Sequence, residues 1–89
     1  MERMDPVLLE LPADMIIQRI SNDLVAIVRI KRESLLYEEG MMLLDCAIKI
    51  REKMPSTTVI IKTTSDVCSK TERTLLESGV RVEKSRIMF

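Results

Sequence analysis

Three apolar segments that resemble strands, separated by two helical patterns, constrain the fold of this chain more than any other feature. The first, Leu24 to Lys31, reads LVAIVRIK and changes from a continuous apolar run to alternation, which is typical of a mostly buried strand. Thr57 to Lys62 and Val80 to Phe89 are the second and third segments. Helical crossovers connect parallel neighbouring strands. The order therefore predicts an α/β fold, a two-layer α+β sandwich with a βαβαβ core and both helices on one mixed sheet.

The first helix is predicted from Ser34 to about Met54. Ser34 is a residue type that caps helices, and Pro55 ends the pattern. Charged residues, including Asp45 and Lys49, fall on one side of this helix. Apolar residues recur at helical spacing on the other side, namely Leu36, Leu43, Ala47, Ile50 and Met54, with Leu44 and Ile48 widening the stripe.

The second helix is predicted after the polar loop Thr63 to Asp66. Ser65 or Asp66 is expected to cap its start, and Gly79 suits the position just after its end. The loop also presents backbone N–H groups at a helix N-terminus beside three hydroxyls, which is the physical basis of a weak anion site. Because Asp66 adds a negative charge there, helix capping is favoured over phosphate binding.

The first 23 residues fit more than one structure. PVLLEL could form a short strand, whereas PADMIIQRIS has Pro12 near a helix start and places Met15, Ile16 and Ile20 on one helical face. We expect an extended arm followed by a short helix, and then a turn at Asn22 and Asp23. Whether this segment packs on the core stays open at this point.

Length and charge limit the functions to consider. The 89 residues predict a single domain, 1–89, for which a homodimer would add buried surface. Fourteen Lys and Arg balance fourteen Asp and Glu, so nucleic-acid binding would need a local basic patch. Apolar runs are far shorter than a membrane span, and the N-terminus has acidic residues where a signal peptide would be basic. We therefore expect a cytoplasmic protein without membrane contact.

The residue types available for chemistry favour a domain that is not an enzyme. The chain has no histidine, and its two cysteines form no CxxC, which removes the usual zinc spacings and predicts no metal and no cofactor. The candidate groups for catalysis are then carboxylates, Tyr37 or a cysteine with a lysine neighbour. Cys68 lies near Lys70 and a helix start, which would lower the pKa of its thiol, but burial as small core residues is favoured for both Cys46 and Cys68.

Four basic residues predict a local patch. Lys31 and Arg32 directly follow the first strand, Lys62 ends the second strand, and Lys70 lies in the first turns of the second helix. If the two strands are neighbours, these four side chains gather at one end of the sheet, where they could contact phosphate. The alternative is that they are ordinary exposed side chains at strand ends and on helix faces.

The spacing of two motifs resembles the Alba family of small archaeal and eukaryotic nucleic-acid-binding proteins. VIIK, Val59 to Lys62, is followed after six residues by Ser69 and Lys70, and RIKRES occupies the place of the family's basic turn. The resemblance covers roughly residues 24–89 and implies a dimeric domain that binds DNA or RNA through Lys31, Arg32, Lys62 and Lys70. The chain departs from the family in its loop TTSD, where arginine and glycine are usual, in its longer first helix, and in lacking a long basic hairpin.

Two functions follow from these features. The first is weak nucleic-acid binding through phosphate contacts by a small non-enzymatic domain. The second is a protein-interaction or assembly module, in which the last strand, ending in Ile87, Met88 and Phe89, pairs with a partner or a second copy. Seven methionines favour the second function, because methionine suits adaptable contact surfaces.

Overall fold

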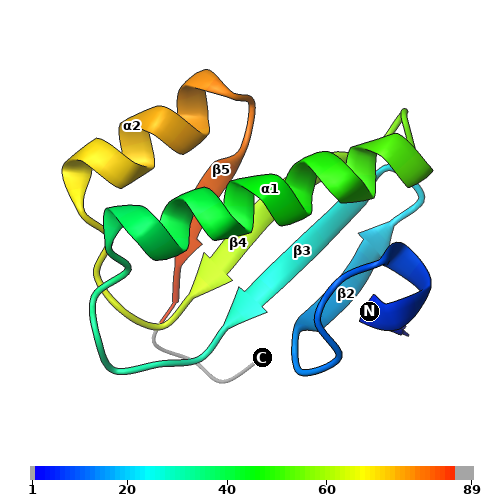
Figure 1. Cartoon of the computed structure of the whole chain (residues 1–89), viewed down its shortest axis with the longest axis horizontal. Coiled ribbons are helices and arrows are strands. Elements are labelled where there is room, and N and C mark those ends of the chain that lie inside the picture. Colours follow the sequence, from blue (N-terminus) through cyan, green and yellow to red (C-terminus); the bar gives the residue numbers. More distant parts are fainter. Residues whose placement is uncertain (1, 86–89) are drawn as a thin grey trace.

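A computed structural model describes residues 2–85, in which two α-helices cover one face of a five-stranded sheet (Figure 1). The predicted α/β two-layer sandwich is therefore confirmed. The elements follow one another as β1 (Glu2–Met4), the 3₁₀ helix η1 (Pro6–Leu9), β2 (Ile16–Ser21), β3 (Leu24–Arg29), α1 (Tyr37–Lys53), β4 (Thr58–Thr63), α2 (Ser69–Glu77) and β5 (Arg81–Lys84).

The sheet is mixed, and β3 is the strand at which its direction changes. The strand order is β1-β2-β3-β4-β5; β1, β2 and β3 pair antiparallel, whereas β3, β4 and β5 pair parallel. The tight turn at Asn22 and Asp23 suffices to join the antiparallel strands β2 and β3, as predicted. The parallel pairs need crossovers, which α1 and α2 supply. Consequently β3 and β4 end at the same edge of the sheet, where both helices begin.

The predicted helix with Met15, Ile16 and Ile20 on one face is wrong, because most of that segment forms strand β2. Ile17 is fully buried in the core beneath the helices, while Ile16 and Ile20 pack on the opposite face of the sheet. This alternation has the period of a strand, and β-branched residues favour it. The short helix of this region lies earlier, at η1, where the Asp5 carboxylate accepts a hydrogen bond from the N–H of Val7 at 3.0 Å.

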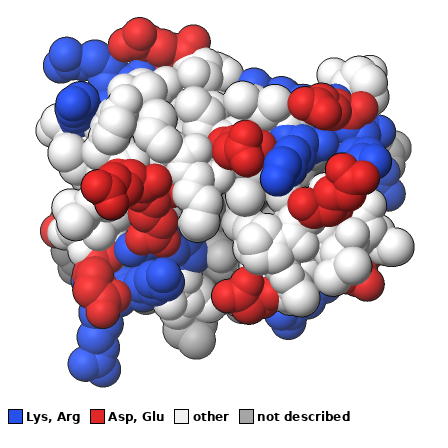
Figure 2. Space-filling model, in the orientation of Figure 1, with Lys and Arg blue, Asp and Glu red and all other residues white. Residues whose placement is uncertain are grey.

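Helix α1 has the predicted amphipathic pattern over most of its length. Asp45 and Lys49 form an ion pair of 3.6 Å on its outer side, and Figure 2 shows positive and negative side chains mixed over the helical face. Leu36 and Ile48 are exposed, although the pattern placed them on the apolar stripe. Leu43, Ala47 and Ile50 of the predicted apolar stripe are buried, and so is Cys46.

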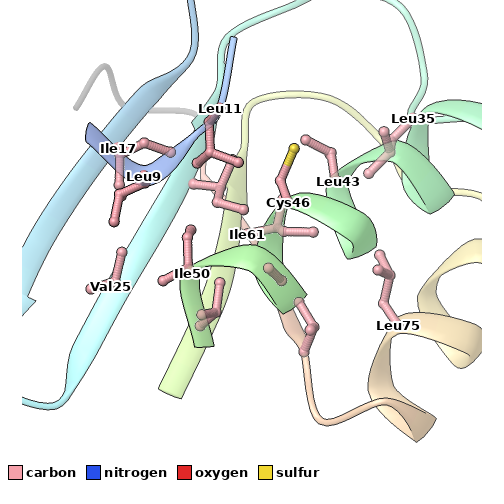
Figure 3. Packing of buried hydrophobic residues seen from close by; sticks show 14 residues of the cluster. Leu9, Leu11, Ile17, Val25, Leu35, Leu43, Cys46, Ile50, Ile61 and Leu75 are labelled. Atoms are coloured by element: carbon pink, nitrogen blue, oxygen red, sulfur yellow. The ribbon is translucent and has the colours of Figure 1, made fainter. Parts of the chain in front are cut away.

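The main core lies between the sheet and the two helices (Figure 3). Strands β2, β3 and β4 contribute Ile17, Val25 and Ile61 to it. Leu9 and Leu11 also pack into this core, so the N-terminal segment belongs to the folded domain. Burial of these apolar side chains is the dominant favourable contribution to folding.

The two helices approach each other closely at Gly40 of α1. A Cβ atom added to Gly40 would lie 2.2 Å from Cγ2 of Thr71 in α2, so only glycine fits this contact. At its other end α2 stops before Gly79, which has a φ of +80° and therefore occupies the predicted position after the helix. Arg51 of α1 donates hydrogen bonds to the carbonyl oxygens of Ser78 and Gly79 at 2.9 and 2.8 Å, which fixes the end of α2 against α1.

No helix within the described range 2–85 is long and apolar enough to cross a membrane. The proposed interface residues Ile87, Met88 and Phe89 lie outside the described residues.

Candidate functional site

The candidate site lies at the edge of the sheet where the parallel strands β3 and β4 end and both helices begin. In open α/β sheets, ligands bind outside the carboxyl ends of parallel strands. Two loops form this edge here, residues 30–36 before α1 and residues 64–68 before α2, and both run along the lower left of Figure 1. The basic residues singled out from the sequence belong largely to these loops and to the first turn of α2.

The two loops are bonded to each other beyond the ends of β3 and β4. Leu35 and Val67 form a parallel bridge, in which the Leu35 N–H donates to the Asp66 carbonyl at 2.8 Å. Closer to the strands, the hydroxyl of Thr64 donates to the carbonyl of Lys31 at 3.1 Å and accepts from the N–H of Lys31 at 3.2 Å. The backbone at this edge is therefore held in place before either helix starts.

This pairing explains why the predicted N-caps are wrong. The bridge holds Leu35 outside the helix and Leu36 is extended, so α1 begins two residues later than a Ser34 cap would place it, and Leu36 occupies the N-cap. For the same reason α2 starts after Cys68 rather than after Ser65 or Asp66. Neither N-cap side chain makes a capping hydrogen bond within the described structure.

Arg29 is the centre of a buried polar network beneath the loops. Its guanidinium donates two hydrogen bonds to the Glu39 carboxylate, Nε to Oε2 at 2.7 Å and Nη2 to Oε1 at 2.9 Å. Nη1 donates to the Glu33 carbonyl at 3.0 Å and to the hydroxyl of Ser65, which also contacts the Thr63 hydroxyl at 3.2 Å. The network thus joins β3, both loops and α1, and most of the polar loop after β4 bonds to protein groups.

The electrostatics of the network follow from its geometry. The hydrogen bond from Arg29 is the largest influence on Glu39 and lowers its pKa; partial burial opposes this, and the charges of Arg29 and Lys31 lower the pKa further. Glu39 is therefore ionised at neutral pH and balances the buried cation. Sequence analysis missed Arg29, although its spacing from Val25 and Ile27 places it on the core side of β3, and that spacing was a usable signal.

Three of the four predicted basic residues lie at this edge. Lys31 and Arg32 belong to the loop after β3, and both line a shallow depression together with Leu36 and Thr64. Lys70 lies in the first turn of α2, with its ammonium 4.5 Å from the centre of the Tyr37 ring of α1. The two helix starts and these three cations therefore belong to the same end of the domain.

The structure places Lys62 apart from the other three basic residues. It belongs to β4 and pairs in register with Val28, and it lies on the sheet face that carries Ile60 rather than on the helical face. A ligand on the loops would therefore not reach Lys62 directly.

Acidic residues share the edge with the cations. Glu33 and Glu38 line the same depression as Lys31, and Lys31 itself lies 3.5 Å from the Glu39 carboxylate. Asp66 is paired with Lys84 of β5. Figure 2 accordingly shows blue and red side chains intermixed at the lower left, over the loop that leads into α1. The local positive potential is modest.

The two cysteines occupy different environments. Cys46 is buried, as predicted, with its sulfur 3.5 Å from the sulfur of Met15, and burial is the main influence that raises its pKa. The expected burial of Cys68 is wrong, because Cys68 is exposed at the N-cap of α2. The backbone N–H of Thr71 is the largest of several influences that lower the Cys68 pKa.

Within residues 2–85, no three side chains of His, Cys, Asp or Glu gather as a metal-binding group. Comparisons of the chain with protein-family models, with curated proteins and with solved structures gave no match.

Proposed function

We propose that this chain is a non-enzymatic domain that binds DNA or RNA weakly through phosphate contacts at the edge formed by its two loops. One observation carries the proposal. The loops before α1 and α2 are bridged to each other, so two helix N-termini without side-chain caps lie at the same edge as Lys31, Arg32 and Lys70. The motif spacing that resembles the Alba family points to the same function.

The physical basis is the charge distribution of a helix start. The first N–H groups of a helix have no intrahelical acceptor, and together they carry about half a positive charge. In α1 the first intrahelical bond is donated by Gly40 to Leu36, and in α2 by Glu72 to Cys68. The N–H groups before these therefore face the loop edge, where an anion such as a phosphate would be favoured.

The three cations set the expected strength and salt dependence. Each phosphate neutralised on duplex DNA contributes about −0.9 to the slope of log K against log salt, so three contacts give a slope of roughly −2.7. Between about 50 and 200 mM salt the affinity should then fall roughly 40-fold. Neighbouring Glu33 and Glu38 oppose binding, which is why we expect a weak interaction without base recognition.

Fluorescence anisotropy with short duplex DNA and single-stranded RNA tests the proposal. We expect binding at about 50 mM salt that weakens at about 200 mM, and the double substitution of Lys31 and Arg32 by Glu should lower the affinity and flatten the salt slope by about 2. Lys49→Glu, which reverses one charge on the outer side of α1, is the control for charge reversal away from this edge and should bind like the parent protein. Equal affinity of the double variant and the control would refute the site.

A second candidate function is assembly through β5. β5 is an edge strand of the sheet. In the part of the chain that is described it pairs with β4 alone, so another strand could add to its other side. Under this hypothesis the parent protein should be larger than a monomer by light scattering. Deletion of residues 87–89 should then reduce the mass, and a monomeric parent would contradict self-assembly.

A further inference from the structure

Two sulfur atoms from distant parts of the chain meet at the margin of the main core. The thiol of Cys46 in α1 donates a hydrogen bond to Sδ of Met15, which directly precedes β2, and the two sulfurs are 3.5 Å apart. Cys46 is 4% exposed, and Figure 3 shows it among the apolar side chains of the core. Because 31 residues separate the two sulfurs in the chain, no spacing motif in the sequence points to this pair.

A third sulfur lies on the solvent side of this pair. Met42 precedes Cys46 by four residues in α1, so their side chains lie on the same face of the helix. Met15 and Met42 both line a cavity of about 390 Å³ between α1 and the segment before β2. Met42 is 48% exposed, so solvent reaches the cavity at this side chain. The cavity therefore gives a path from solvent to Met15, whose sulfur contacts Cys46.

The separation of the Cys46 and Met15 sulfurs fits two ligands of one metal ion. Sulfur ligands that each lie about 2.3 Å from a metal, the length of a zinc–thiolate bond, are about 3.8 Å apart at a tetrahedral angle. The observed separation is 3.5 Å, so the two side chains need to move by only a few tenths of an ångström to hold an ion. In the hydrogen bond the thiol proton lies between the two sulfurs, and the ion would take its place.

The charge balance of a buried site favours a monovalent ion. A cysteine loses its thiol proton when its sulfur coordinates a metal ion. A Cu(I) ion that replaces this proton leaves the net charge of the site unchanged, whereas a divalent ion would add one positive charge beside the core, where an uncompensated charge is costly. Thiolate and thioether sulfurs are also the ligand types that select Cu(I).

We propose that Met15, Met42 and Cys46 form a binding site for one Cu(I) ion. The Cys46 thiolate and the Met15 thioether are the inner ligands, and the Met42 thioether binds from the solvent side. When the ion binds, one proton leaves the Cys46 thiol for solvent, and neither the copper nor the sulfur changes its oxidation state. None of these three residues belongs to the proposed nucleic-acid contacts, so the two proposals can fail separately.

The experiment titrates Cu(I) without oxygen into the reduced full-length chain that carries Cys68→Ser, in competition with a chromogenic Cu(I) chelator such as ferrozine. Cys68 is exposed, and its replacement leaves Cys46 as the only thiol of the chain. We expect one Cu(I) per chain, accompanied by thiolate-to-copper charge-transfer absorption in the ultraviolet. If Cys68→Ser abolishes the binding seen in the parent protein, or if neither chain takes copper from the chelator, the proposal is overturned.

Removal of single sulfurs from this Cys68→Ser chain tests the ligands. Cys46→Ala should lower the Cu(I) affinity by more than about 100-fold, because even partners outside the ligand set contribute about 10–100-fold. Met15→Leu and Met42→Leu, which conserve side-chain volume, should each lower it by at least about tenfold. Met54→Leu changes a methionine that packs on the same core and is the matched control, which should bind like the Cys68→Ser chain. Equal Cu(I) affinities of Met15→Leu and Met54→Leu would overturn the site, and this comparison stands even if Cys46→Ala does not fold.

Discussion

The ion pair between Arg29 and Glu39 allows a quantitative prediction for the substitution Glu39→Gln. The Arg29 side chain is 4% exposed and that of Glu39 is 26% exposed, so the pair lies between the surface and buried classes. The amide oxygen of the substituted side chain can still accept one hydrogen bond, but the guanidinium loses its counter-charge while it stays buried. We therefore expect the main effect to be on stability.

The magnitude follows from the two limiting classes of ion pair. Exposed pairs contribute about 0.2–1 kcal/mol, whereas removal of one partner from a fully buried pair costs about 3–5 kcal/mol. With one partner buried and the other partly exposed, Glu39→Gln should lower the free energy of unfolding by about 2–3 kcal/mol. For a domain of this size the loss corresponds to a decrease in Tm of roughly 10–20 °C.

Urea unfolding followed by circular dichroism measures this difference. Asp45→Asn is the matched control, because it removes the carboxylate of the exposed Asp45–Lys49 pair and should cost no more than about 0.5 kcal/mol. If Glu39→Gln lowers the free energy of unfolding as little as the control does, burial of Arg29 does not depend on the Glu39 carboxylate. The structural account of the network would then be wrong.

The pH dependence gives a second check on the same pair. Because Arg29 lowers the pKa of Glu39 in the folded state, its contribution is complete above the ordinary pKa of glutamate, about 4.3. The contribution is lost as the pH falls through the lower, folded-state pKa. The stability difference between the parent and Glu39→Gln should therefore shrink on acidification, and a difference that grows would contradict the sign of the interaction.

Two further predictions concern the helices, and urea unfolding tests both. Gly40→Ala should destabilise the domain by about 1–3 kcal/mol through its clash with Thr71, despite the higher helix propensity of alanine. The added change Thr71→Ser removes the clashing methyl group and should restore most of the lost stability. If the destabilisations of the two single variants simply add in the double variant, this explanation is contradicted. Leu36→Ser supplies the missing side-chain cap of α1, whereas Leu36→Ala removes the same exposed side chain without adding a cap. The serine variant should therefore be about 1 kcal/mol more stable than the alanine variant. Equal stabilities of the two variants would refute the cap assignment.

The sequence determined the architecture because its periodic patterns are local. The apolar runs of β3 and β4, the stripe of α1 and the stop at Pro55 each restrict the chain over a few residues, and together they predict a mixed sheet with two crossover helices. Gly79 and the turn at Asn22 and Asp23 were predicted for the same reason.

The N-terminal segment shows where local patterns fail. IIQRI fits one face of a helix and the alternation of a strand equally well over five residues, so periodicity could not decide between them. The decision came from pairing with β3, which gives this segment backbone partners and lets its isoleucines pack on both faces of the sheet.

Tertiary structure alone decided the composition of the candidate site. Pairing of Leu35 with Val67 moved both helix starts along the chain, which left Leu36 and Cys68 as N-caps and exposed a cysteine that composition favoured as buried. Parallel pairing of β3 and β4 brought Lys31 close to Thr64, and strand alternation separated Lys62 from the other cations. Patterns in a sequence report which face a residue occupies, whereas contacts between distant segments are set only when the chain folds.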